Sequence, residues 1–148
     1  MTITAGVAGN ILEWYDFAIY GFFAPVLGTL FFPADDPTTS LIASFGAFAA
    51  GFLMRPVGGA LFGYLGDRIG RKRALNLSVL LMAVPTFVIG LMPTHAQIGV
   101  GAAVILVFLR MLQGLSVGGE YTSSIVYLAE SAPEGKRGLF TSASMMGG

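Results

Sequence analysis

The chain has 148 residues, of which 55% are hydrophobic and only 11% are charged. Soluble domains carry about 25% charged residues, so this chain has too few to cover a water-facing surface. The formal net charge is zero and there is no cysteine, which argues against a nucleic-acid partner and excludes disulfides and thiolate metal sites. The composition favours a protein embedded in a lipid bilayer over an unusually apolar soluble domain.

Four long apolar segments follow one another along the chain. They are predicted as membrane-spanning helices at residues 6–32, 39–66, 74–92 and 97–129, each close to or above the roughly 20 residues that cross a bilayer. Thr38 or Thr39 is expected to cap the second span. A fifth apolar segment, 138–148, would rise only about 16 Å, half of a hydrocarbon core. We therefore expect the chain to be part of a longer protein.

The basic residues of the connections are distributed unevenly. Four of the eight lie between spans two and three and two lie between spans four and five, whereas the other two connections have none. Cytoplasmic loops are enriched in Lys and Arg. We expect the N-terminus and loops 67–73 and 131–137 to be cytoplasmic, and the membrane to be a bacterial inner (plasma) membrane.

Five ionisable residues remain inside the predicted spans. They are Glu13, Asp16, Arg55, Arg110 and Glu120. Each costs at least about 2.5–3.5 kcal/mol at the centre of a bilayer, so they should face a shared interior and pair with one another. The alternative to a functional site is a set of structural ion pairs that holds a bundle together.

Helical spacing places these charges on two facing stripes. Residues three, four or seven apart share one face of a helix. The stripe on the first span contains Asn10, Glu13, Asp16 and Tyr20, and the stripe on the fourth contains Arg110, Gln113, Val117, Glu120 and Ser124, bordered by Tyr121. The two stripes carry opposite charges at Asp16 and Arg110, which predicts that the helices face each other.

Small and aromatic residues have separate expected roles. Gly59 and Gly63, and Gly114 and Gly118, form GxxxG patterns that let helix backbones approach closely. Aromatic residues of the first span are expected to contact lipid or anchor the helix at the interface; these are Phe17, Tyr20, Phe22, Phe23, Phe31 and Phe32. His95 is expected in a short exposed loop.

Several motifs, in order along the chain, resemble one family of transporters. Residues 63–73, with the pattern G-x-L-x-D-R-x-G-R-K, residues 110–114, with R-x-x-Q-G, and residues 127–138 resemble motifs of the major facilitator superfamily. Residues 9–17, 55–59 and 118–121 resemble more narrowly its metabolite:proton symporter branch, which includes carriers for proline and betaine, α-ketoglutarate, shikimate and citrate.

The resemblance implies an all-α membrane protein of twelve helices in two halves. This chain would supply four helices and the start of a fifth, part of the N-terminal six-helix bundle, and would need the C-terminal half of the same chain as its partner. The loop residues Gly63, Asp67, Arg68, Gly70 and Arg71 would form a cytoplasmic gate. Asp67 would cap a helix of the other half, and Arg71 would pair with Glu130, near Arg137.

The resemblance also implies a function, which is the proton-coupled symport of a small organic solute by alternating access. Arg110 matches an arginine linked to proton coupling, because a fixed cation keeps a nearby carboxylate ionised until the pair breaks. Glu13, Asp16 and Glu120 are candidates for the group that takes the proton or for solute contacts. Arg55, Arg110 and Gln113 belong to the same candidate set for solute binding and proton coupling. A carboxylate or a zwitterion would fit these charges.

Other functions stay open at this point. A facilitator or a proton-driven efflux carrier of the same superfamily would share the motifs. A non-transporting membrane bundle would not need five charges in its spans, and a membrane enzyme would need a metal, haem, nucleophile or phosphate site that one histidine and no cysteine do not suggest. We expect no cofactor, no metal and no catalytic residue.

Overall fold

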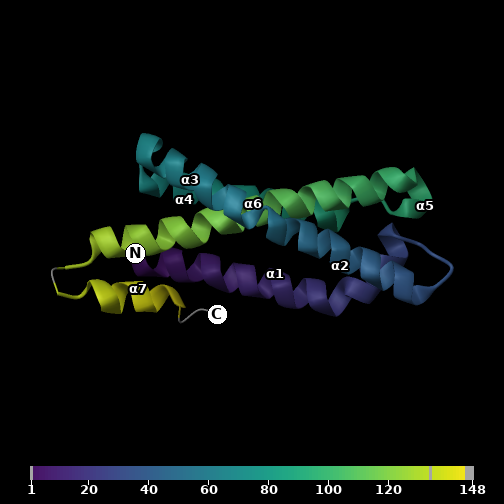
Figure 1. Ribbon diagram of the computed structural model, residues 1–148, viewed down its shortest axis with the longest axis horizontal. Coiled ribbons are helices and arrows are strands. Elements are labelled where there is room, and N and C mark those ends of the chain that lie inside the picture. The colour runs from purple at the N-terminus through teal and green to yellow at the C-terminus, as the bar shows by residue number, and fades with distance from the viewer. Residues whose placement is uncertain (1, 134, 146–148) are drawn as a thin grey trace.

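The computed structural model describes residues 2–133 and 135–145, and of these it leaves out the side chains of 2–10, 12, 121–124, 127, 128, 131, 140 and 143–145. Over the described residues the chain is built of helices that lie along one long axis (Figure 1). The predicted all-α fold class is therefore confirmed. Asn10, Tyr121 and Ser124, which extend the predicted stripes, have side chains outside this description.

Seven helices are described. They are α1 Thr2–Phe31, α2 Pro37–Leu53, α3 Arg55–Ile69, α4 Arg71–Leu91, α5 His95–Ile98, α6 Val100–Ser131 and α7 Arg137–Met145. Among the described residues, three segments are long and apolar enough to cross a membrane: Pro37–Ile69, Arg71–Leu91 and Val100–Glu120. His95 begins the short helix α5 rather than lying in a loop, since Thr94 and Gln97 form a capping box around it.

The second predicted span is two helices rather than one. α2 ends and α3 begins at Met54, whose φ and ψ of −82° and −12° lie near the helical region. Pro56 explains the break, because it lacks a backbone N–H and its ring clashes with the carbonyl oxygen four residues earlier. Arg55 is consequently the first residue of a new helix, directly after a break in the backbone ladder.

The start of α2 also differs from the prediction. Its N-cap is Asp36, whose side chain accepts a hydrogen bond of 3.3 Å from the backbone N–H of Thr38. Pro37 follows as the first helical residue, where its missing N–H costs nothing. Asp36 and Pro37 together fix the helix start two residues before the predicted range.

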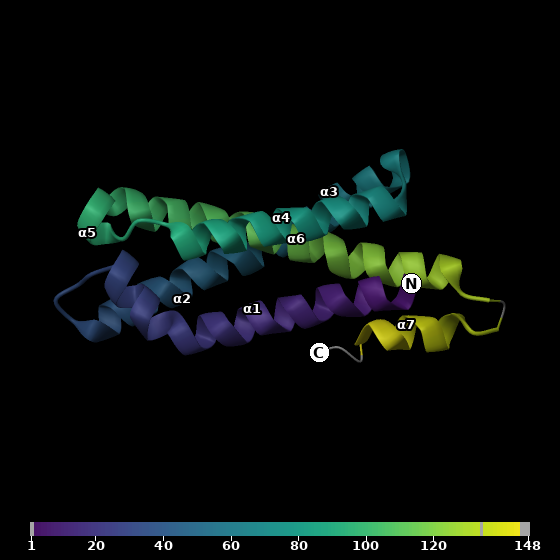
Figure 2. The ribbon, with the colours of Figure 1, turned by 180° about the vertical axis from the view of Figure 1, so that it is seen from behind.

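The connections that carry basic residues lie at the same end of the bundle. The start of α1, the α3–α4 connection and the α6–α7 connection share one end, and the α1–α2 connection and α5 share the other, in both views (Figures 1 and 2). This arrangement agrees with the alternation on which the predicted orientation rests. Which side of a membrane this end faces remains a prediction.

α6 is the central helix, and it packs against every other described helix. Glycines allow this close packing on α6. A Cβ atom on Gly114 would overlap the backbone carbonyl of Gly51, and one on Gly118 would overlap the carbonyl of Arg55. The predicted contact through the second GxxxG pattern is confirmed, whereas Gly63 of the first pattern has open space where a Cβ would lie.

The outer surface is apolar, as expected for lipid contact. Phe22 of α1 is 87% exposed, and Phe87 of α4 is 69% exposed. The expectation of lipid-facing aromatics was wrong for Tyr20 and Phe31, which are 1% and 3% exposed. Phe31 instead packs with Ala102 and Leu106 of α6 in a small apolar core near the α5 end.

Candidate functional site

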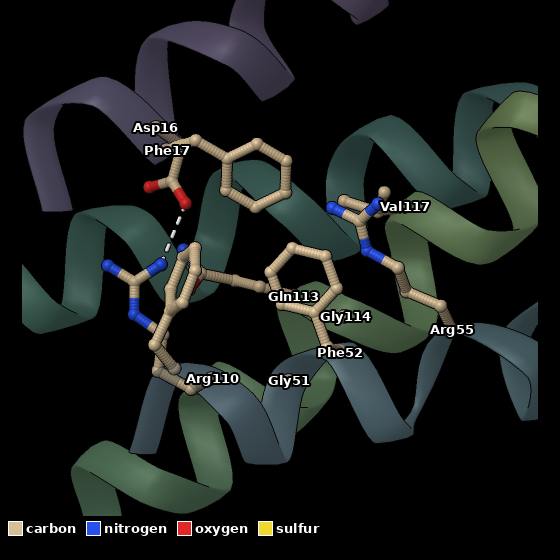
Figure 3. Close-up of a pocket in the computed structure, with 10 residues that line it drawn as sticks. Asp16, Phe17, Gly51, Phe52, Arg55, Arg110, Gln113, Gly114 and Val117 are labelled. Atoms are coloured by element: carbon tan, nitrogen blue, oxygen red, sulfur yellow. Dashed lines mark hydrogen bonds and ion pairs between the residues drawn. The ribbon is translucent and has the colours of Figure 1, made fainter. Parts of the chain in front are cut away.

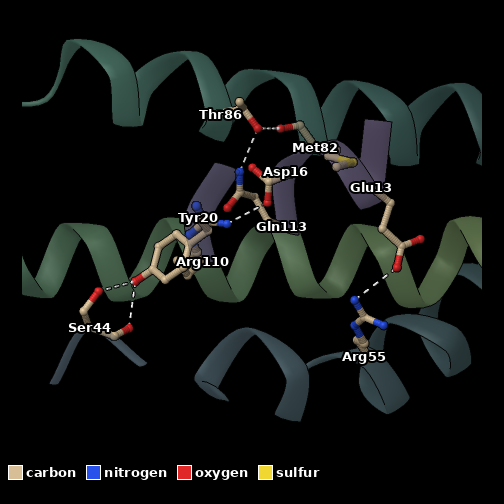
Figure 4. A network of polar contacts seen from close by, with 9 residues as sticks. All are labelled: Glu13, Asp16, Tyr20, Ser44, Arg55, Met82, Thr86, Arg110 and Gln113. Carbon is tan, nitrogen blue, oxygen red and sulfur yellow. Dashed lines mark hydrogen bonds and ion pairs between the residues drawn. The ribbon is translucent and has the colours of Figure 1, made fainter. Parts of the chain in front are cut away.

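Two buried charges from helices far apart in the sequence form the centre of the bundle. Nη1 of Arg110 on α6 donates a hydrogen bond of 2.7 Å to Oδ2 of Asp16 on α1 (Figure 4). The arginine side chain is 8% exposed and the aspartate side chain 14%. The structure thus brings together the two residues whose opposite charges the sequence placed on facing stripes.

Aromatic contacts hold Arg110 in place. Its guanidinium lies 3.9 Å from the centre of the Tyr20 ring, a cation–π contact. The Tyr20 hydroxyl donates a hydrogen bond of 2.7 Å to the backbone carbonyl of Ser44 on α2, and its ring stacks on Phe48. Tyr20 therefore links α1 to α2 and fixes one face of the Arg110 guanidinium.

A second pair of charges lies closer to the end with the basic connections. Nη2 of Arg55 is 3.1 Å from Oε1 of Glu13, and the two side chains are 27% and 12% exposed. The contact is not aligned as a hydrogen bond, since this nitrogen has no hydrogen-bond partner among the described residues. Arg55 is held by charge and by the rings of Phe17 and Phe52, which lie 4.6 and 4.2 Å from its guanidinium carbon.

These rings separate the two arginines. In the view of Figure 3, Phe17 and Phe52 lie between the side chains of Arg110 and Arg55, and the two rings stack on each other with centres 5.4 Å apart. Phe17 was expected to contact lipid, so this is a correction. Sequence spacing contained the signal, because Phe17 is four residues after Glu13, on the charged face of α1.

The cavity between these groups is too small for an organic solute. It has a volume of about 20 Å³ and is lined by both arginines, Asp16 and Gln113, together with Phe17, Phe48, Gly51, Phe52, Gly114 and Val117. A cavity of this size has room for about one water molecule. The space between the two arginines and Asp16 is therefore too small for a solute in the described arrangement.

Gln113 connects the pair to α4. Its side-chain nitrogen donates a hydrogen bond of 2.7 Å to the hydroxyl of Thr86, which in turn donates one of 2.8 Å to the carbonyl of Met82. The Gln113 carbonyl oxygen and Nε of Arg110 are buried and have no hydrogen-bond partner among the described residues. Buried polar atoms are nearly always paired, so these two are available to a water molecule or a solute.

A larger cleft opens on the other side of Asp16. It has a volume of about 400 Å³, and α1, α4 and α6 line it. Small-molecule sites commonly have volumes of about 300–1,000 Å³. Its walls are mostly apolar, and its lining residues are Tyr15, Asp16, Ile19, Val79, Met82, Ala83, Thr86, Phe87 and Glu120.

Glu120 lies in the wall of this cleft without a cation. It is 5% exposed, and its Oε1 atom has no hydrogen-bond partner among the described residues. The ion pairs of the described residues leave it out, because Arg55 and Arg110 are each paired with an acid of α1. The expectation that all five charges would pair holds for four of them.

A salt bridge and a glycine shape the connection between α3 and α4. Nη2 of Arg71 lies 2.7 Å from Oδ1 of Asp67, one helical turn earlier, and Asp67 is 66% exposed. Gly70 between them has a φ of +94°, a conformation that suits glycine. Arg68 lies with its guanidinium 5.0 Å from the ring of Tyr64.

Arg71 has a different partner from the one that the family resemblance predicts. Within the described residues, Arg71 pairs with Asp67 and forms no ion pair with Glu130. Glu130 and Arg137 are both exposed, at the ends of α6 and α7. The short link at Gly70 turns the start of α4 back onto the last turn of α3, which puts Asp67 within reach of Arg71. The expected cap of Asp67 on another helix involves residues that this chain does not contain.

A family model described as "Sugar (and other) transporter" matches residues 1–147. The chain belongs to this family of the major facilitator superfamily. It is 47% identical over 140 residues to a proline/betaine transporter of Salmonella typhimurium, covering 95% of this chain and 28% of that protein. It is 45% identical to an alpha-ketoglutarate permease and 43% identical to a shikimate transporter of Escherichia coli, covering 95% of this chain and 32% of each of them.

Membership of the sugar (and other) transporter family confirms the resemblance to the major facilitator superfamily, and the names of the relatives match the predicted branch. The chain spans only 28–32% of the length of these three relatives. No solved structure matches the chain. Family and apolar helices together identify an integral membrane protein, and the names of the relatives are those of transporters rather than enzymes.

Proposed function

We propose that the complete protein containing this chain is a secondary transporter that couples the movement of a small organic solute to that of protons. The observation that carries the proposal is the buried Asp16–Arg110 pair between α1 and α6. A buried pair is costly to desolvate and contributes little net stability compared with apolar side chains of the same size. A pair of this kind at the centre of a transporter is better explained by an exchange of partners.

The exchange follows from charge balance. A solute carboxylate that binds Arg110 competes with Asp16 for the same guanidinium. Once released, the Asp16 carboxylate would be a buried charge without a partner, and a proton removes that charge. Binding of the solute anion and binding of a proton therefore favour each other, which is the requirement for symport.

The relatives support a solute with a carboxyl group. Proline, betaine, α-ketoglutarate and shikimate each contain at least one, and relatives are named for all four. In this chain the two guanidinium groups beside the small cavity, those of Arg55 and Arg110, are suited to bind it. Both are occupied by acids in the described arrangement, so a solute enters only with a change in these pairs.

The glycine contacts and the break at Met54 support alternating access. α6 meets the carbonyl groups of Gly51 and Arg55 on either side of the break. Small residues at these contacts let helices shift past each other without losing their packing. We propose that movement at this junction changes the distance between Arg55 on α3 and Glu13 on α1. We also propose that the Asp67–Arg71 loop faces the cytoplasm in a bacterial inner membrane and stabilises one of the two states of the transporter.

The test is solute accumulation by the complete protein in liposomes. With an imposed proton gradient, labelled proline, betaine or α-ketoglutarate should accumulate, and a protonophore should abolish the accumulation. Uptake that is undiminished after the gradient has collapsed would contradict proton coupling and favour a facilitator. Solute movement against the direction of proton flow would favour an efflux carrier.

A further inference from the structure

Glu120 is the one acid of the described bundle interior for which the chain provides no cation. Of the eight basic residues, Arg55 and Arg110 are paired with Glu13 and Asp16. The other six lie at positions 68–73 and 136–137, at the end of the bundle where α3 meets α4 and α6 meets α7. Two acids and two arginines balance, and a third acid remains.

The surroundings of Glu120 favour its neutral form. The side chain is 5% exposed, and its Oε1 atom has no hydrogen-bond partner among the described residues. An ionised carboxylate that is buried and has no cation as a partner is costly, so binding of a proton stabilises this site.

The groups on the neighbouring elements leave this conclusion unchanged. α1 contributes acids and tyrosines, α3 contributes Arg55, which is engaged with Glu13, and α2 has no ionisable residue. The part of α4 that lines the cleft, from Val79 to Phe87, has none either. The ionisable residues of the surrounding helices include Glu13, Tyr15, Asp16, Tyr20, Arg55 and Arg110. Toward the end with the basic connections, α3 also carries Tyr64, Asp67 and Arg68, α4 begins with Arg71, Lys72 and Arg73, α6 continues with Tyr121, Tyr127 and Glu130, and α7 begins with Arg137. Among the described residues, none of these forms an ion pair with Glu120.

Glu120 and Asp16 line the same cleft. The cleft of about 400 Å³ between α1, α4 and α6 has both carboxyl groups in its wall, and no Lys or Arg is among its lining residues. On α6, Glu120 lies ten residues after Arg110, which corresponds to about 15 Å along the helix toward the end with the basic connections. The cleft thus links the central pair to a second acid nearer that end, and its volume is sufficient for water.

We propose that Glu120 is a second proton-binding station, which receives the coupled proton from Asp16 through this cleft. The proton leaves the Asp16 carboxyl group, whose carboxylate forms its salt bridge with Arg110 again, and the Glu120 carboxylate binds it by way of water in the cleft. The described arrangement, with Asp16 paired and Glu120 unpaired, is the state after this transfer. Glu120 then releases the proton toward the end of the bundle that holds the basic connections. The inference rests on the proposed proton coupling.

Infrared spectroscopy of the complete protein tests the protonation state directly. A protonated carboxyl group gives a C=O band that shifts in heavy water and is separate from carboxylate bands. We expect such a band at neutral pH in the wild type, its loss in Glu120→Gln, and its persistence in Asp35→Asn, which makes the same change at an exposed loop residue. A band that persists unchanged in Glu120→Gln would overturn the proposal.

Transport measurements separate this inference from the function on which it rests. With wild-type accumulation driven by the proton gradient, Glu120→Gln should lower gradient-driven accumulation at least tenfold and lower solute exchange across the membrane much less. Equal losses in the two assays, or accumulation at the wild-type level, would overturn the role of Glu120 while leaving proton coupling in place. Wild-type uptake that ignores the gradient would instead refute the proposed function.

A conservative variant covers the case in which Glu120→Gln does not fold. Glu120→Asp keeps a carboxyl group on a shorter side chain, so it should retain part of the accumulation. The pH profile of that accumulation should move, and the protonated-carboxyl band should appear at a changed frequency. A pH profile and band identical to those of the wild type would mean that another group binds the proton.

Discussion

Arg110 and Asp16, which are 94 residues apart in the sequence, are joined by a hydrogen bond of 2.7 Å in the interior of the helix bundle. The bond ties the first helix to the central helix, and the two side chains are only 8% and 14% exposed. Each side chain is therefore the main partner that neutralises the charge of the other.

Removing one member of the pair should destabilise the protein more than removing both. Arg110→Gln or Asp16→Asn alone leaves a buried charge without a partner, which costs about 3–5 kcal/mol. The double variant leaves no unpaired charge, so its loss of stability should be smaller than that of either single variant and well below the sum of the two. Thermal unfolding of the complete protein in detergent measures all three. Additive losses would mean that the two residues do not depend on each other.

The same variants should separate transport from stability. Asp16→Asn and Arg110→Ala should each abolish accumulation driven by a proton gradient, because they remove the exchange of partners that couples solute to proton. Asp35→Asn is the matched control, since it makes the same carboxyl-to-amide change at an exposed position. Gradient-driven accumulation by Asp16→Asn at the control level would exclude Asp16 from coupling.

Packing at α6 should be sensitive to a single methyl group at Gly114. Gly114→Ala places a Cβ against the backbone carbonyl of Gly51, and neither backbone can move aside as a flexible side chain would. We expect a loss of about 1–3 kcal/mol, seen as a lower unfolding temperature. Gly90→Ala is the control, because no atom lies within 4 Å of its added Cβ. Equal unfolding temperatures for the two variants would show that α2 and α6 are not in close contact.

Gly63 inside α3 and Gly70 between α3 and α4 should respond differently to the same substitution. Gly70→Ala forces a residue with a side chain to a φ of +94° and should cost about 1–2 kcal/mol. Gly63→Ala adds a methyl group into open space inside a helix and should be neutral or stabilising, since alanine favours helix by about 1 kcal/mol. Unfolding temperatures compare the two directly. An equal loss of stability for Gly63→Ala and Gly70→Ala would mean that the positive φ of Gly70 does not explain its effect.

The absence of cysteine allows a clean test of orientation for this part of the protein. Single cysteines introduced by Lys72→Cys and Asp35→Cys lie at opposite ends of the described bundle. A thiol reagent that cannot cross the membrane should label Asp35→Cys in intact cells, and Lys72→Cys only in inverted vesicles or opened cells. Any other cysteines of the complete protein are first replaced. Labelling of Lys72→Cys in intact cells would reverse the proposed orientation.

Most of the helices could be read from the sequence, because apolar length and interrupting residues are local properties. The ranges expected for the first, third and fourth spans contain most of α1, α4 and α6. The break at Met54 was missed, although Pro56 was visible. A proline in the sequence indicates that one backbone hydrogen bond is lost at that point. Whether the helix bends or ends there depends on its packing against neighbouring helices, which the sequence does not show.

The candidate site was predicted in part for the same reason. Stripes three and four residues apart put Asp16 and Arg110 on facing helices, and the family motifs drew attention to residues 63–73. The roles of Phe17 and Tyr20 were missed, because an aromatic residue in an apolar helix faces lipid or interior with the same local pattern. The exclusion of Glu120 from the ion pairs was not visible in the sequence either, since it depends on which acid each arginine reaches.

The sequence by itself determined that the chain is a set of apolar helices with buried charges and basic connections, because hydropathy, helical periodicity and charge count are properties of single segments. Only the tertiary structure decided which charges meet. Two arginines cannot satisfy three acids, and the close contacts of α6 with Gly51 and Arg55 fix the depths at which the helices cross. Those depths pair Asp16 with Arg110 and Glu13 with Arg55, and they leave Glu120 in the wall of a cleft without a cation.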